Sequence, residues 1–343
     1  MKKISILLVL IMTFVFSLSA VVSAESVKSN VNYNDEIYEG VVSYVNEIYA
    51  DMDDEEKEKL IEELYKEKSE FTLVTETFTS GNNEIDEAYK RVMDEENYIV
   101  NLIIEQGKDT ALDKWEFNLN YLKNNYETIK NIPDINLSYV DSYIEAYEWQ
   151  LISKDMPDEK INRKSVVTQS NEYDWSKAVE YAKKYYKDYN DAYPDWSAPP
   201  YGGDCANFIS QCVHEGGKPM EGTPGTEKEA KDWSNWFSEG KEHDVKKVSS
   251  TWRGANAFKS YWQSHATAYK KFTSVGSESF SFGWNGDAVA LLTDNDRAYH
   301  VMIIVGYTSP LDFVLAAHTY DTKSAKLSEK IPSHGCMIFN MRE

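Results

Sequence analysis

The sequence predicts an α+β fold in which a mostly helical, acidic region precedes a domain of helices and antiparallel strands. Apolar residues recur at helical spacing through most of residues 25–160, and three short β-branched runs follow late in the chain. Acidic residues outnumber basic ones 34 to 15 over residues 25–165, but only 23 to 19 over residues 166–343. This change of charge, together with the polar stretch 154–171, predicts a domain boundary near residue 165.

The start of the chain has the pattern of an export signal. Lys2 and Lys3 precede an almost wholly apolar run over residues 4–16, and small residues at 22–24 predict cleavage after Ala24. The apolar run is short for a membrane span. We therefore expect a secreted or cell-wall-associated bacterial protein with no integral membrane span after cleavage. An uncleaved membrane anchor is the alternative.

The composition excludes several classes of partner and scaffold. A formal net charge of −21, from 36 basic and 57 acidic residues, argues against binding to nucleic acid. An exported chain with only three cysteines is unlike a disulfide framework and has at least one free thiol. Cys205 and Cys212 lie two helical turns apart, which is too far for a bridge. The sequence leaves open whether Cys212 and Cys336 form a disulfide.

The first half of the mature chain, residues 25–165, is predicted to be a helical accessory domain. Apolar residues at helical spacing predict helices over residues 38–49, 51–70, 84–106, 111–129 and 137–152. Alternating polar and β-branched or aromatic residues predict a strand over residues 71–79. This half contains no histidine and no metal-ligand spacing. We therefore expect its aromatic residues to form a core and its acidic face to be solvated.

The second half, residues 166–343, changes character. A helix with a broad aromatic face is predicted over residues 175–190, and another over residues 254–263 within a tryptophan-rich connection. The sequence then predicts a turn and strand over residues 284–292 and two strands over residues 300–306 and 313–319. The tryptophan-rich connection either walls a substrate groove or packs as a cap, and both interpretations stay open.

The segment Tyr201-Gly-Gly-Asp-Cys205 predicts a sharp turn that enters a helix. Glycine permits the bend, and Asp204 is a favoured residue type for the N-cap of the helix. Cys205 would then stand in the first turn, where the helix dipole and unpaired N–H groups favour thiolate. This placement suits a nucleophile. The alternative is a small buried cysteine that fills a contact between helix and sheet.

Two histidines are candidates for the group that activates Cys205. A hairpin centred on residue 309 would place His300 opposite His318, side by side on one face of the sheet. A cysteine nucleophile needs an imidazole within hydrogen-bond reach, and that imidazole needs a third group to orient it. We therefore assign His300 as the base and His318 as the orienting group, with Asp321 and Asn340 as fallbacks. The histidines predicted to be structural or solvated are His214, His243, His265 and His334.

The order of these elements resembles the papain-like cell-wall hydrolases of bacteria, of the NlpC and CHAP types. It resembles more closely the putative amidase domain family of secreted bacterial proteins. The matching elements are the aromatic helix at 173–190, Gly-Gly-Asp-Cys-Ala-Asn-Phe-Ile-Ser-Gln at 202–211, Gly-Asp-Ala-Val at 286–289, His-Val-Met-Ile-Ile-Val-Gly at 300–306 and Ala-His-Thr at 317–319. The resemblance covers residues 170–343 and implies a papain-like fold. It also implies that Cys205 is the nucleophile and His300 the base, with His318 less surely the orienting residue. Tyr299 departs from the family pattern, in which an acidic residue precedes the histidine.

The sequence and the resemblance together predict an exported cysteine amidase or peptidase that acts on the peptide part of peptidoglycan through a thioester. Backbone N–H groups at the helix start, aided by the Tyr201 hydroxyl, would hold the oxyanion, and we expect Asp204 to contact the substrate or the oxyanion as well. Trp284 either lines the groove or packs under the sheet. The alternatives are acyl transfer, as in transglutaminase-like proteins, and a cell-surface binding module with a vestigial site. The chain implies no cofactor and no metal.

Overall fold

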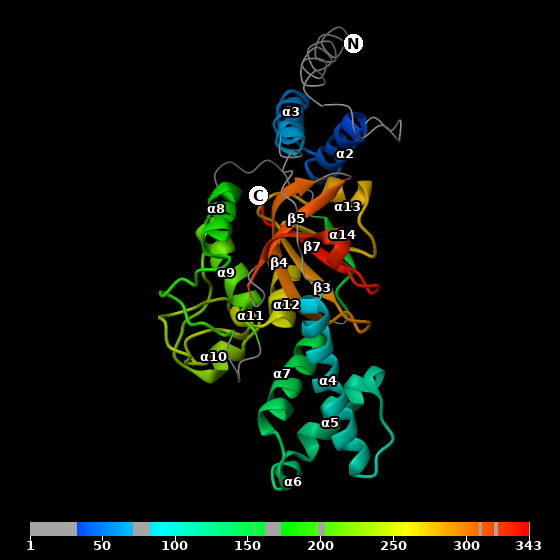
Figure 1. The fold of residues 1–343 in the computed structure, drawn as a ribbon, viewed down its shortest axis with the longest axis vertical. Coiled ribbons are helices and arrows are strands. Elements are labelled where there is room, and N and C mark those ends of the chain that lie inside the picture. The colour runs from blue at the N-terminus through cyan, green and yellow to red at the C-terminus, as the bar shows by residue number, and fades with distance from the viewer. Residues whose placement is uncertain are drawn as a thin grey trace. The chain divides into compact units, whose positions relative to one another are not determined.

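In the computed structural model, an antiparallel sheet organises the second half of the chain (Figure 1). Its seven strands, counted among the residues that the structure describes, lie in the order β1-β2-β7-β3-β4-β5-β6. They are β1 (Glu159–Ile161), β2 (Ala268–Phe272), β3 (Ala288–Leu292), β4 (Ala298–Thr308), β5 (Asp312–Ala317), β6 (Thr322–Lys326) and β7 (Cys336–Asn340). The three predicted strands are confirmed as β3, β4 and β5. The α+β class is confirmed with them.

The structure describes residues 33–70, 83–153, 155–161, 173–197, 203–308, 311–318 and 322–342. The predicted signal sequence, the strand predicted over residues 71–79 and Tyr201 lie outside these ranges. Residues 34–343 belong to one compact unit, and an independent fold for residues 25–165 stays a prediction. Within the described ranges, every helix is too short or too polar to cross a membrane.

Alternation along the strands divides the apolar residues of the sheet between two faces. On β3, Ala288 and Ala290 belong to one buried cluster, while Val289 and Leu291 belong to another on the opposite side. Four helices cover the first face and pack on one another (Figure 1). They are α8 (Trp175–Tyr185), α9 (Cys205–Glu215), α11 (Ser250–Arg253) and α12 (Ala255–His265). The short helix α10 (Glu227–Lys231) contacts α11. We call this side of the sheet the α9 face.

The second face, which we call the α2 face, is covered by elements from both halves of the chain. The helices that contribute apolar side chains to it are α2 (Tyr33–Ile48), α3 (Asp54–Glu70), α13 (Ser277–Phe282) and α14 (Leu327–Lys330). Helix α3 begins three residues later than predicted, because the Asp53 carboxylate accepts hydrogen bonds from the N–H groups of Glu55 and Glu56, each at 2.9 Å. Residues that the sequence assigns to the accessory region are therefore part of the core of the sheet.

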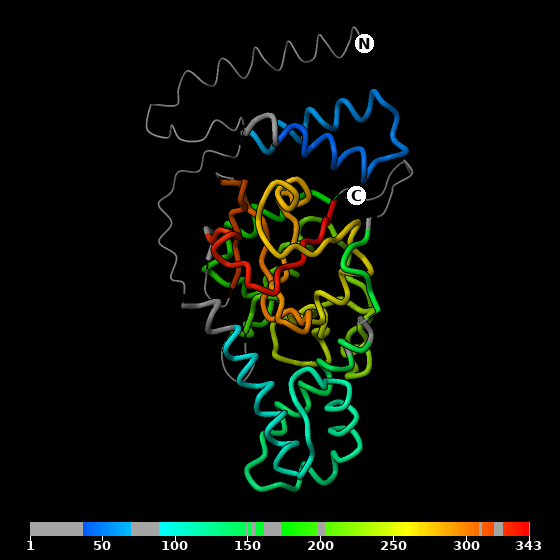
Figure 2. Tube along the Cα trace, turned by 90° about the vertical axis from the view of Figure 1, so that its right-hand side faces the viewer, coloured from blue at the N-terminus to red at the C-terminus, as the bar shows by residue number. Residues whose placement is uncertain are grey.

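The remaining helices of the first half form a bundle with a core of its own (Figure 2). They are α4 (Asn83–Glu105), the 3₁₀ turn η2 (Leu112–Lys114), α5 (Trp115–Asn124), α6 (Tyr126–Ile129) and α7 (Leu137–Ser153). The helix predicted over residues 111–129 is divided at Asn125, whose Nδ2 donates to the Tyr121 carbonyl at 2.8 Å.

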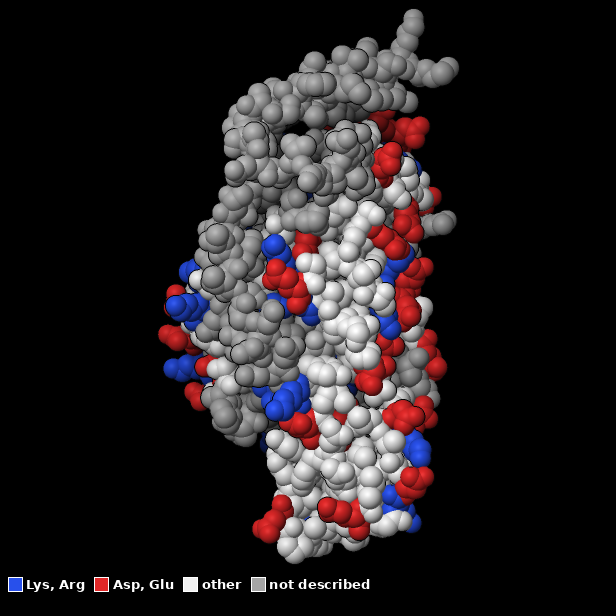
Figure 3. Space-filling view, turned by 45° about the vertical axis from the view of Figure 1, so that its right-hand side comes forward, with Lys and Arg blue, Asp and Glu red and all other residues white. Residues whose placement is uncertain are grey.

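Acidic side chains are spread along the face shown in Figure 3, as expected for a solvated acidic surface.

A buried polar cluster fixes α3 to the α2 face. Arg342 donates to both carboxylate oxygens of Glu67 at 2.8 Å and to the Asn285 carbonyl at 3.0 Å. The Tyr307 hydroxyl donates to Glu67 at 3.1 Å and accepts from the Asn285 N–H at 2.9 Å. Two-point pairing of this kind is geometrically specific. It makes α3 an integral part of the fold.

We expect Tyr307→Phe to lower the free energy of unfolding by about 2 kcal/mol, because it leaves the buried Asn285 N–H without its acceptor. Urea denaturation of the mature protein measures this change. Tyr121→Phe, at a partly exposed tyrosine of α5, is the control and should stay within about 0.5 kcal/mol of wild type. Equal stability of wild type and Tyr307→Phe would show that the cluster does not hold α3.

Candidate active site

Cys205 is the first residue of α9, as the sequence predicts. The bend before it uses Gly203, whose φ of +147° lies in a region that favours glycine. The thiol is 8% exposed, and burial raises its pKa. The backbone N–H groups of Val301 and Ala206 are directed at the sulfur and lower the pKa against this effect. Desolvation is the larger effect, so the pKa of Cys205 is shifted in the direction opposite to the one that the helix start alone favours.

Asp204 occupies the N-cap position of α9, but its carboxylate does not cap the helix. It accepts hydrogen bonds from the Trp196 N–H and from Asn207 Nδ2, each at 2.8 Å, and it pairs with His318. Burial raises the pKa of this carboxyl, and the His318 contact lowers it in turn. The side chain is fully buried. The prediction that Asp204 contacts substrate or oxyanion is therefore wrong, because its carboxylate is committed to internal donors.

His318 is held on all sides. Its Nδ1 lies 2.7 Å from Asp204 Oδ2, and its Nε2 lies 2.5 Å from the Tyr185 carbonyl oxygen. The ring stacks on Phe208 at a centroid distance of 3.8 Å and lies against Tyr189 at 4.2 Å. Both ring nitrogens therefore lie within hydrogen-bond distance of an oxygen atom. His318 thereby joins the ends of α8 and β5 to the residue that precedes Cys205.

The predicted register of the β4–β5 hairpin is wrong by one residue near its open end. Ile303 pairs with Ala316, and a shift at Ile304 separates this register from the one near the turn. Extending the pairing places Val301, and not His300, opposite His318. His300 pairs instead with Leu291, whose side chain belongs to the α2 face. The two histidines therefore do not stand side by side, and His318 does not orient His300.

His300 nevertheless lies near the start of β4, the strand that contacts Cys205. It directly precedes Val301, whose N–H is directed at the thiol. The imidazole is 2% exposed, and burial lowers its pKa to about 3, helped by the charges of Arg91 and Lys330. The ring is therefore neutral at pH 7. A neutral imidazole is the form that can accept a proton.

The depressed pKa of His300 predicts how stability depends on pH. Between about pH 6.5, the usual value, and pH 3, the unfolded chain binds a proton at His300 that the folded chain does not. The free energy of unfolding should therefore fall on acidification, by about 2 kcal/mol from this group between pH 7 and pH 5. Urea denaturation at several pH values, compared with His300→Gln, isolates the contribution.

The exposed His243 supplies the control, because His243→Gln should keep the wild-type pH dependence. The expectation is wrong if the wild-type and His300→Gln curves run parallel from pH 7 to pH 5.

Four other predicted site residues have structural positions or are not described. Trp284 is fully buried on the α2 face, where its ring lies 4.9 Å from that of Tyr44. It cannot line a groove, and the alternative of packing under the sheet is the observed one. Asn340 Nδ2 donates to Asp287 at 2.7 Å inside the fold. Tyr201 and the fallback Asp321 lie outside the described residues.

The other two cysteines are free and buried on opposite faces of the sheet. Cys212 belongs to the cluster on the α9 face and Cys336 to the cluster on the α2 face, so the disulfide left open by the sequence does not form. Burial raises the pKa of both thiols, that of Cys336 to about 12. Cys205 is thus the thiol best placed for chemistry.

Three of the four histidines that the sequence predicts to be structural or solvated have contacts that agree with this interpretation. His214 Nδ1 contacts the Lys218 carbonyl at 2.9 Å, His243 Nε2 contacts the Asp195 carbonyl at 2.6 Å, and His265 stacks on Tyr261 at 3.8 Å. In the part of the chain that the structure describes, no group of three or more His, Cys, Asp or Glu side chains could hold a metal ion.

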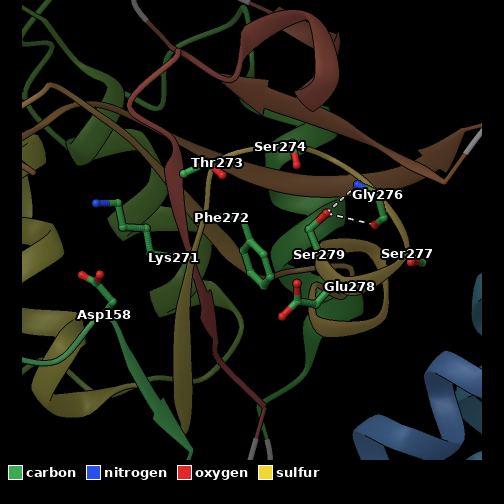
Figure 4. A pocket seen from close by; sticks show the side chains of 9 residues that line it. All are labelled: Asp158, Lys271, Phe272, Thr273, Ser274, Gly276, Ser277, Glu278 and Ser279. Atoms are coloured by element: carbon green, nitrogen blue, oxygen red, sulfur yellow. Dashed lines mark hydrogen bonds between the residues drawn. The ribbon is translucent and has the colours of Figure 1, made fainter.

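One surface pocket lies away from these residues (Figure 4). Asp158 and Lys271 stand at one end, and Glu278 and Ser279 at the other. The Ser279 hydroxyl bonds to the backbone of Gly276 at 3.0 Å, so it is committed to the local turn. The lining contains neither cysteine nor histidine. The pocket therefore offers no thiol or imidazole for the predicted chemistry, and the candidate site stays at Cys205.

The sequence did not predict the proximity of Arg91 to this site. Arg91 lies on α4, and its charge lowers the pKa of both Cys205 and His300. In the sequence it is one charge among many on a helix of the acidic region. No local pattern distinguishes it, because the contact depends on how α4 packs against β4.

Comparisons with known proteins cover this half of the chain. Residues 172–339, a stretch that includes Cys205, His300 and His318, match the family described as putative amidase domain. The uncharacterized protein YhbB of Bacillus subtilis (strain 168) is 29% identical over 153 residues, which are 44% of this chain and 43% of that protein. The chain thus matches less than half the length of this relative. No solved structure matches the chain significantly. By these comparisons, the sheet domain is similar to the putative amidase domain family.

Proposed function

We propose that this protein is an exported, cysteine-dependent amide hydrolase with a papain-like arrangement of nucleophile and base. The observation that carries the proposal is the position of Cys205, at the first turn of α9 with two N–H groups directed at its sulfur, inside a segment that matches an amidase family. A helix start of this kind stabilises charge that develops on sulfur and on a neighbouring oxyanion.

The chemistry follows from a neutral thiol and a neutral imidazole. Cys205 Sγ bonds to the amide carbonyl carbon as its proton passes to His300, and backbone N–H groups hold the oxyanion. The C–N bond then breaks, and the proton on His300 leaves with the amine, giving a thioester. His300 next takes a proton from water as the water attacks the thioester. The carboxylic acid is released and the thiol is restored.

The substrate that we propose is the peptide part of peptidoglycan. The export pattern at the start of the chain would bring the enzyme to the bacterial cell wall, where peptides supply amide bonds. Purified peptidoglycan incubated with the mature protein should release new amino groups, and mass spectrometry of the fragments should identify the cleaved bond. Intact peptidoglycan after prolonged incubation would remove this substrate from the proposal.

Two observations favour a second candidate, a binding module with a vestigial site. The Cys205 thiol is nearly buried, and the strand register directs His300 toward the α2 face. Hydrolysis discriminates between the two candidates, because burial of the thiol makes slow alkylation of Cys205 the expected result for both. Absent hydrolysis of peptidoglycan by the folded mature protein would favour the binding module.

A further inference from the structure

Strand β4 contains a β-bulge directly before His300. Leu291 of β3 pairs with His300. The next residue of β3, Leu292, pairs with Ala298. Tyr299 is therefore an extra residue that interrupts the regular pairing of β4. Bulges of this kind re-aim neighbouring side chains and are common next to active sites. The direction of the His300 imidazole therefore depends on the geometry of this bulge.

The distribution of buried residues along β4 shows the effect of the bulge. Ala298 and Val301 both belong to the cluster on the α9 face, although residues three apart lie on opposite faces of a regular strand. Tyr299 belongs to the cluster on the α2 face. His300 thus stands where β4 crosses from one face to the other. Because α9 packs against β4, a small change in the bulge would move the imidazole relative to Cys205.

Helix α4 contacts the bulge and the residue that precedes β4 (Figure 1). The Tyr89 ring meets the Tyr299 ring edge to face at a centroid distance of 5.4 Å. Glu96 Oε1 lies 2.5 Å from Arg297 Nη1, and these two side chains are only 3% and 10% exposed. Both contacts fall within three residues of His300. A helix of the acidic region therefore fixes the start of the strand that carries the proposed base.

Two further helices hold the same segment. The guanidinium carbon of Arg297 lies 4.4 Å from the centre of the Tyr143 ring of α7. The Tyr143 hydroxyl in turn donates to the Val92 carbonyl of α4 at 2.9 Å. On α12, Asn256 Oδ1 accepts a hydrogen bond from the Ala298 N–H at 3.1 Å. The segment that leads into the bulge is therefore held by side chains from α4, α7 and α12.

We infer that Glu96 and Arg297 are positioning residues for amide hydrolysis, because their ion pair fixes the bulge that directs His300. A purely stabilising role explains the pair less well, since apolar side chains of similar volume often give the same stability as a buried ion pair. What the charged pair supplies in addition is a defined direction, through the fork of the guanidinium and the carboxylate. The inference rests on the proposed function for the reaction, whereas the state of the His300 ring can be measured without a substrate.

The double variant Glu96→Met/Arg297→Met separates positioning from stability. Methionine fills irregular apolar space without a charge, so we expect the urea midpoint to stay near that of wild type. With soluble peptidoglycan fragments as substrate, kcat should fall about 100-fold, because a small displacement of a catalytic group has this effect. KM should stay within about twofold of the wild-type value, since both side chains are buried.

Nitrogen-15 NMR of the histidine rings supplies a readout that needs no activity. The His300 signals are assigned by their absence from the spectrum of His300→Gln. They should shift in Glu96→Met/Arg297→Met, while the signals of His214 stay in place. A contribution to stability alone would move neither set of signals in the folded protein.

The matched control is Lys123→Met/Glu148→Met, which removes an exposed ion pair of 2.7 Å between α5 and α7. It should leave both kcat and the His300 signals unchanged. If Glu96→Met/Arg297→Met does not fold, Arg297→Lys takes its place. This variant keeps the charge but loses the planar fork, so kcat should fall about tenfold and the His300 signals should still shift.

Unchanged His300 signals in the folded variant overturn the inference, and so does an unchanged kcat when the wild-type protein is active. Failure of the proposed function gives a different result. If the wild-type protein hydrolyses no peptide but the His300 signals shift only in the variants of the buried pair, the hydrolase is refuted and the control of the His300 ring by α4 stands.

Discussion

Cys205→Ala is expected to abolish amide hydrolysis while leaving the protein folded. The sulfur is the atom that forms the thioester, and without it the N–H groups of Ala206 and Val301 have no nucleophile to stabilise. Removal of a catalytic nucleophile commonly lowers kcat by a factor of about 10⁴ or more. The change removes one atom from a nearly buried side chain, so the free energy of unfolding should fall by about 1 kcal/mol. The rate of amino-group release from peptidoglycan measures the loss.

Cys212→Ala is the matched control for this variant. Cys212 lies on the same helix, is fully buried and has a pKa raised well above the usual value. Its replacement should cost some stability but leave most of the activity of the folded fraction. The single variant His300→Ala should also lose its activity, because no other group is assigned to take the thiol proton. Activity retained in Cys205→Ala would rule out a mechanism in which Cys205 is the nucleophile.

The parts of the fold that the sequence predicts correctly depend on local signals. Helix α9 begins at Cys205 because a glycine bend and a polar residue precede an apolar helical pattern. Strands β3, β4 and β5 are runs of β-branched and small apolar residues, buried along their length. Strand β2 has two lysines among its five residues, so a search for apolar and β-branched runs does not detect it. Local patterns therefore locate Cys205 at a helix start and the strand that contacts it.

The site itself depends on features that no local pattern contains. The pairs near the turn, such as Thr308 with Asp312, centre the hairpin on residue 310 and not on residue 309. The register shift after Ile304 then leaves His318 opposite Val301 and not His300, and the side-chain alternation of a strand converts this difference of one residue into a change of face. The partner of His318 is Asp204, at a separation of 114 residues. The contribution of Arg91 depends on the packing of α4. These contacts are long-range consequences of packing, so spacing in the sequence could not predict them.

The His318–Asp204 pair is expected to be the largest single polar contribution to stability at the site. Both side chains are buried, with exposed fractions of 1% and 0%. Loss of one partner leaves the other desolvated and without its main contact, which typically costs 3–5 kcal/mol. His318→Gln and Asp204→Asn should therefore each lower the free energy of unfolding by about 3 kcal/mol or more, measured by urea denaturation at pH 7. His243→Gln should change it by less than about 0.5 kcal/mol.

The double variant separates pairing from the other contacts of each residue. If the pair acts as a unit, the double variant should be less destabilised than the sum of the singles by about 2 kcal/mol. Additive costs would show instead that Tyr185, Trp196 and Asn207 hold each partner on its own. The same variants test positioning, because Asp204 is bonded directly to Cys205. Folded His318→Gln should alkylate at Cys205 with an altered pH midpoint and hydrolyse amides about 100-fold more slowly, since a small displacement of a nucleophile has this effect. These results would show that His318 serves the proposed reaction through the backbone that presents the thiol, a role that requires no contact with His300.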